Sequence, residues 1–124
     1  MPAANQDLTA EQGATFSLLL TIKDSSNVAV DLTGNTYAGQ VRKKISDEDP
    51  VATFTCTVQN QITNTGELLI SLTPAETSAI PMKSQNKQER TLEEYAYDIE
   101  ATYPDGSKER ILEGIFSLSP EVTR

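Results

Sequence analysis

The side chains that could do chemistry in this chain of 124 residues are few. It contains no histidine and a single cysteine, Cys56. Histidine is the side chain that most often serves as a general base or metal ligand near neutral pH. Ser-His-Asp and Cys-His sites are therefore excluded within the chain, while Ser-Lys variants stay formally open. One cysteine also argues against a structural zinc site and excludes a disulfide framework.

Two groups of carboxylates are the remaining candidates for a site. Asp47, Glu48 and Asp49 offer oxygen ligands for calcium, but their spacing is not that of a calcium loop, and they are typical of a solvated turn. Asp98 and Glu100 share one face of a predicted strand, where a general acid and base could work together. Alternating charge is also normal on the outside of a sheet. We therefore predict no catalytic residue, no metal, no cofactor and no enzymatic activity.

Aromatic residues suggest a second kind of site. Tyr95, Tyr97 and Tyr103 recur on one face of a predicted strand and could form a platform for sugars or bases. Their spacing also matches that of Ile99, which favours a core face with the hydroxyl groups near the edge of the sheet. Cys56 alternates with apolar neighbours in the same way, so we predict a buried small side chain and not a reactive thiol.

Charge and hydropathy argue against two classes of partner. The formal charge is 10 − 18 = −8, and no basic stripe interrupts it. Because lysine and arginine supply most of the affinity for phosphates, we predict no nucleic-acid binding. The sequence has no apolar run long enough to span a membrane, and residues 1–7 lack the apolar core of a signal peptide. We expect synthesis in the cytoplasm and no membrane contact.

Strand-like alternation covers most of the chain. About seven strands are predicted, at residues 14–23, 28–32, 36–45, 51–58, 67–72, 95–103 and 111–118. One short connector helix is expected near residues 74–80, because Thr73 and Glu76 form a capping box around Pro74. The pattern predicts an all-β fold, an antiparallel β-sandwich of immunoglobulin-like size and strand count. Residues 8–119 form its single domain with a mobile polar loop at 82–92, between a flexible segment 1–7 and a short tail 120–124.

The last predicted strand is apolar on both faces. One face carries Leu112, Gly114, Phe116 and Leu118. Ile111 and Ile115 fall on the other face, which is typical of a central strand or of one whose outer face meets a partner. Glu113 stands between apolar neighbours, so we expect it to pair with a basic residue such as Arg42 or Arg110, or to lie at a contact.

Motifs along most of the chain occur together in a known family. A "QG…F" strand precedes a "DLTG" turn and a strand ending in "R-K"; a "GELLIS" strand leads into "TPAETSAIP"; and a "YAYDIE" strand is followed by the ending "LEGIFSLSPEVTR". This set resembles small bacteriophage virion proteins and the N-terminal domains of phage upper baseplate proteins. The resemblance covers residues 7–124 and is most specific in the last thirty. Residues 82–92 depart from it, because the usual link there is shorter and less charged.

The resemblance implies a bacteriophage virion structural protein without enzymatic activity, located in the virion and made in the host cytoplasm. It would act as an adaptor of the tail or baseplate that binds other virion proteins through sheet edges and termini, and as a homo-oligomer. Alternatives are a neck, collar or capsid decoration protein, or a carbohydrate-binding module on a tail fibre. The candidate partner contacts are Ile111, Glu113, Ile115, Val122 and Arg124.

Overall fold

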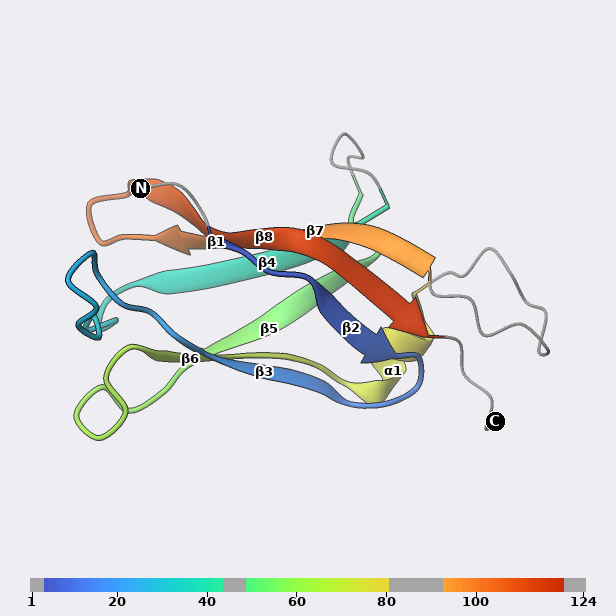
Figure 1. The fold of residues 1–124 in the computed structure, drawn as a ribbon, viewed down its shortest axis with the longest axis horizontal. Coiled ribbons are helices and arrows are strands. Elements are labelled where there is room, and N and C mark those ends of the chain that lie inside the picture. Colours follow the sequence, from blue (N-terminus) through green and yellow to red (C-terminus); the bar gives the residue numbers. More distant parts are fainter. Residues whose placement is uncertain (1–3, 44–48, 81–92, 120–124) are drawn as a thin grey trace.

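The computed structural model describes residues 4–43, 49–80 and 93–119, and these residues fold mostly as β-strands (Figure 1). The strands are β1 (Ala4–Asn5), β2 (Leu8–Glu11), β3 (Phe16–Thr21), β4 (Thr36–Arg42), β5 (Ala52–Val58), β6 (Glu67–Leu72), β7 (Glu93–Thr102) and β8 (Lys108–Ser119). One helix, α1 (Pro74–Ser78), follows β6. The predicted all-β class and the single connector helix are confirmed.

The strands form one curled sheet. Their order is β1-β8-β7-β4-β5-β6-β3. Strand β2 also pairs with β8, closer to its C-terminal end than β1 does. Strand β5 makes the bend. Its first half, through Ala52 and Phe54, pairs with β4, whereas Thr55 to Val58 pair with β6. Strands β6 and β3 at one end of the sheet therefore face β8 and β7 near the other end. The ring centroids of Phe16 on β3 and Phe116 on β8 lie 5.5 Å apart.

The core fills the space inside this curl. Strand β6 contributes Leu68, Ile70 and Leu72, which are almost fully buried, as the alternation of its sequence predicts. The three phenylalanines meet at the centre, where Phe54 packs against Phe116 with ring centroids 5.9 Å apart and tilted by 69°. Such edge-on contacts between aromatic rings stabilise a core beyond the area that they bury.

The prediction of a purely antiparallel sheet is wrong at the N-terminal strands. Strand β1 pairs in parallel with β8, placing Ala4 opposite Leu112, and β2 does the same from Leu8 opposite Phe116. The segment 1–7 was expected to be flexible, but its described part includes β1, and Asp7 bonds β8. Its short polar residues carry little strand signal of their own. They find partners because the outer edge of β8 offers unpaired backbone groups.

The predicted strand 28–32 is also not formed as such. It contributes a single bridge, between Lys23 and Ala29. The carboxylate of Asp24 accepts hydrogen bonds from the backbone N–H groups of Ser26 and Val28, and Asn27 has a φ of 64°. Backbone donors bonded to a nearby side chain are not available to a strand ladder, which ends the pairing after one bridge.

The hydroxyl groups of two threonines stabilise helix α1, one at its N-cap and one within it. Thr73 caps the helix and forms the predicted capping box with Glu76. Thr77 is fully buried; its Oγ1 accepts a hydrogen bond from the backbone N–H of Gly13 at 3.0 Å and lies 2.9 Å from the carbonyl oxygen of Ala14, to which it donates. These bonds tie the helix to the chain segment that leads into β3.

Candidate functional site

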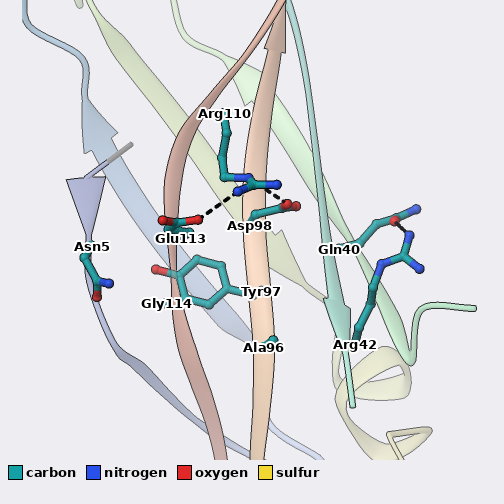
Figure 2. Close-up of a pocket in the computed structure, with 9 residues that line it drawn as sticks. All are labelled: Asn5, Gln40, Arg42, Ala96, Tyr97, Asp98, Arg110, Glu113 and Gly114. Atoms are coloured by element: carbon teal, nitrogen blue, oxygen red, sulfur yellow. Dashed lines mark hydrogen bonds and ion pairs between the residues drawn. The ribbon is translucent and has the colours of Figure 1, made fainter. Parts of the chain in front are cut away.

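The candidate site lies on the outer surface of strands β4, β7 and β8, which we call the charged face. Its outward side chains include Gln40, Arg42, Glu94, Ala96, Asp98, Glu100, Lys108, Arg110, Glu113 and Ile115. A hollow of about 480 Å³ is centred on this face. Figure 2 shows the residues that line it, with small side chains between longer polar ones.

A β-bulge in β8 sets which side chains reach this face. Ile99 pairs with Leu112, but the next residue, Glu100, pairs with Arg110, so Ile111 is an extra residue in β8. Arg110 and Glu113 are three residues apart and would point to opposite faces of a regular strand. The bulge brings both to the charged face. Residue 111 is instead partly buried against the core, which corrects the expectation that it shares the outer face with Ile115.

Arg110 is the centre of the charge network on this face. Its Nε lies 3.2 Å from Oδ2 of Asp98, and its Nη1 lies 3.1 Å from Oε2 of Glu113 (Figure 2). The two carboxylates stand directly opposite each other on β7 and β8. Like charges in such a pair repel, and the guanidinium between them offsets the repulsion. The predicted pairing of Glu113 with a basic residue is confirmed.

Gly114 and Tyr97 line the hollow and stand opposite each other, but they point to the inner side of the sheet, where they hold the N-terminal segment. A side-chain carbon at Gly114 would lie 2.3 Å from the backbone oxygen of Gln6, so only glycine lets that segment approach. The hydroxyl of Tyr97 donates a hydrogen bond to the same oxygen. Asp7 then accepts a hydrogen bond from the backbone N–H of Ile115 at 3.1 Å. The passage between β1 and β2 is thus fixed at three points.

The predicted contact residues fall into three groups. Glu113 and Ile115 lie on the charged face, where Ile115 is 41% exposed and stands opposite Ala96. Ile111 faces the core side and lines a second hollow of about 550 Å³ at the end of the curl. Val122 and Arg124 lie outside the described residues, as does the loop 82–92. The structure therefore brings two of the five together.

The second hollow opens between the two halves of the sheet and was not predicted. Apolar and aromatic side chains dominate its lining, among them Leu20, Ile22, Val30, Tyr37, Tyr103 and Ile111. Burial raises the pKa of Tyr37, although its hydrogen bond from Asn35 acts in the opposite direction. The bulge that adds Ile111 to the inner side could not be read from the strand alternation, because each residue of the pair 111–112 is apolar.

The aromatic platform suggested by the sequence is not formed by Tyr95 and Tyr97. Both side chains are buried, and the ring of Tyr97 meets Phe54 edge-on at a centroid distance of 6.2 Å. Burial, with a smaller contribution from the charge of Asp7, raises the pKa of Tyr97 to about 12. The same cause, aided by Glu93, raises the pKa of Tyr95 to about 12. Core packing, the favoured interpretation of these tyrosines, is confirmed.

The chemistry that the described residues can support is limited. They contain no group of three or more metal-binding side chains. Asp98 forms an ion pair with Arg110, and Oε1 of Glu100 lies 3.9 Å from Nζ of Lys108.

Burial raises the pKa of Cys56 to about 11, so its thiol stays protonated at neutral pH, as expected of a packed cysteine. Asp47 and Glu48 of the proposed calcium group lie outside the described residues. Among the described residues, no helix is long and apolar enough to cross a membrane.

Comparisons with known proteins leave the family open. No protein-family model matches the chain, and no curated protein does. Among solved structures, a 2,6-sialyltransferase from Photobacterium sp. JT-ISH-224 matches with a TM-score of 0.26 and 12% identity. The match covers 95% of this chain and 18% of that chain. The prediction that the chain is not an enzyme is withdrawn, since nothing in these comparisons supports it. A likeness this weak assigns no activity either.

Proposed function

We propose that this chain is a structural component of a bacteriophage virion, an adaptor of the tail or baseplate that binds other virion proteins. The resemblance of its sequence motifs to phage virion proteins gives the class. The observation that supports a contact on the charged face is Ile115, 41% exposed although it sits in mid-strand, opposite the small side chain of Ala96. An apolar side chain beside a hollow, ringed by charges, has the arrangement of an interface centre with a polar rim.

The geometry supports such a contact in a second way. The charges around Ile115 are already paired within the chain, since Arg110 bridges Asp98 and Glu113. A partner that covers this face would therefore bury fewer unpaired charges, which are the costly groups at an interface. The bulge and the N-terminal strands hold the backbone of β8 in place, so little ordering would accompany binding.

The immunoglobulin-like sandwich belongs to the same proposal. The strand order places β8, β7 and β4 side by side, and β3 beside β6. Immunoglobulin domains likewise place their last strands in one sheet with a middle strand, and an early strand in the facing sheet. The sheet is continuous through β5 and has parallel N-terminal pairs, so we propose the sandwich as a description of the two facing halves and not of two separate sheets.

The test is incorporation into the virion. We expect the chain in the tail fraction of purified particles, and we expect Ile115→Asp to reduce its incorporation while the isolated protein stays folded. Ile62→Asp is the matched control, because Ile62 is 93% exposed in a turn. Particles that contain no copy of the chain would contradict the virion assignment. Equal incorporation of both variants would leave the assignment standing and remove Ile115 from the contact.

A further inference from the structure

We propose that two copies of this chain associate edge to edge through strand β3, as an antiparallel pair of β3 strands about a two-fold axis. This inference rests on the described residues alone and not on the proposed place in a virion. It concerns the face opposite the charged face, formed by the outward side chains of β3, β5 and β6.

The first observation is that the edge of β3 is open and unprotected. Strand β3 ends the sheet order, and β6 is its sole strand partner among the described residues. Proteins usually protect such an edge with a proline, a charged side chain or a bulge. The six residues from Phe16 to Thr21 contain no proline, glycine or charge, and their pairing with β6 is regular. The edge is thus a template for another strand.

The second observation is incomplete burial of the core side of β3. Phe16, Leu18 and Leu20 face the core but stay partly exposed. On the neighbouring strand β6, Leu68 and Ile70 have no exposed area. The difference follows from position, because β6 has a strand on each side and β3 does not. A second β3 strand would cover this apolar flank, which is the driving force for the pairing.

The third observation concerns charge. We call the outward side chains of β3, β5 and β6 the hydroxyl-rich face: Ser17, Leu19, Thr21, Thr55, Thr57, Glu67, Leu69 and Ser71. Glu67 is its single charged residue. Two copies that each carry a net charge of −8 repel at short range unless they meet where charges are absent. This face and its β3 edge meet that condition, so a second copy is the partner that the charge pattern fits.

The other open edges suit a copy less well. The edge of β1 and β2 is interrupted between Asn5 and Leu8 and carries Glu11. The free edge of β5 extends only over its second half, from Thr55 to Val58, where β4 no longer pairs with it. Strand β3 offers six consecutive residues. A two-fold axis that runs between two copies of this strand, level with its middle, relates them as an antiparallel pair, and two-fold symmetry is that of most homodimers.

This geometry places the two copies of Leu19 near each other across the axis. Directly opposed residues of antiparallel strands have Cα atoms about 4.5–5.5 Å apart, within the range that a disulfide spans. The variant Leu19→Cys in a Cys56→Ala background should therefore form a covalent dimer on mild oxidation. Thr57→Cys in the same background is the control, since Thr57 lies in the same row of the same face but two strands away from the β3 edge.

Sedimentation of the full chain provides the second measurement. We expect a monomer–dimer equilibrium that ends at two copies, and a dissociation constant raised at least about tenfold by Leu19→Lys. Ser17→Lys, on the same outward side of β3, should act likewise, whereas Thr57→Lys should change the constant little. A chain that remains monomeric, a dimer indifferent to both β3 variants, or growth beyond two copies through β5 would each overturn the proposal.

Discussion

The two outer faces of the curled sheet are built on opposite plans. The charged face is crossed by a bulge and bridged by Arg110, and on the inner side of the same strand Gly114 admits the N-terminal segment. The hydroxyl-rich face is regular, has one charged residue and is bounded by an open strand. Each irregularity of the first face fixes a side chain in place. The hydroxyl-rich face has no bulge and no bridging arginine, and its short side chains leave the backbone of the edge strand β3 accessible.

This difference between the charged face and the hydroxyl-rich face indicates which of them can select a partner and which can bind a second copy of the chain. A face with fixed and paired charges can reject a partner whose charges do not match, because an unpaired charge at an interface is costly. A regular face without charge cannot discriminate in that way, but it permits two identical acidic chains to approach. We therefore propose a different partner for each face, and four measurements test this division.

The largest effect is expected at Gly114. A valine there would collide with the backbone of Gln6, which cannot move without losing its bond from Tyr97. We expect Gly114→Val to lower the free energy of unfolding by about 3 kcal/mol, the upper end of the usual range for overpacked sites. Denaturant titration measures the loss, with Ser117→Ala on the same strand as the control. Equal losses in the two variants would mean that the N-terminal segment does not depend on Gly114.

The next effect is expected at Thr77, which ties α1 to the segment that leads into β3. Thr77→Val removes the acceptor of the Gly13 N–H and leaves that partly buried donor without its partner. We expect a loss of about 2 kcal/mol in the free energy of unfolding. Thr57→Val is the matched control, because Thr57 is exposed in a strand where valine is equally suited. A loss at Thr57 as large as that at Thr77 would show that burial of the hydroxyl is not the cause.

The features of the fold that depend on local sequence patterns could be predicted from the sequence. Alternation placed the side chains of β6 and β7 correctly, and the Thr73–Glu76 spacing located the helix. Gly39, inside the predicted strand 36–45, marks a close approach: a side-chain carbon there would lie 2.3 Å from Cδ1 of Ile99 and 3.0 Å from the ring of Phe54. Gly114 gives the same signal, a glycine inside an apolar strand, but its neighbour comes from a segment more than 100 residues away.

Long-range pairing explains the failures. Ala4 and Asn5 of β1 have low strand propensity, so their pairing with β8 depends on the open edge that β8 presents and not on their own types. The bulge at Ile111 is likewise invisible in the sequence, because the choice between Ile111 and Leu112 for the regular inward position is made by the partner strand. Because the bulge brings Arg110 to the charged face, the role of Arg110 could not be predicted from the sequence either.

Arg110 tests whether the charge network stabilises the charged face. Its side chain and those of Asp98 and Glu113 are 40–53% exposed, so the ion pairs are screened by water and salt. We expect Arg110→Ala to cost about 1 kcal/mol at low salt, most of it from the repulsion left between the two carboxylates. The loss should shrink in 1 M salt, where the Debye length is about 3 Å. A salt-independent loss would point to packing of the arginine stem instead. Lys108→Ala, with its longer ion pair at 3.9 Å, is the control.

The smallest effect is expected where each face exposes an apolar side chain. Leu19 is 53% exposed and Ile115 is 41% exposed, and threonine at either position is a β-branched side chain that suits a strand. We expect Leu19→Thr and Ile115→Thr each to change the free energy of unfolding of the monomer by less than about 0.5 kcal/mol. Denaturation at a protein concentration low enough to favour monomers measures this, since a dimer would add stability. A loss above about 1 kcal/mol would mean that the side chain holds its own face together and is not available to a partner. A change below that limit would leave both side chains available for the contacts proposed for the two faces.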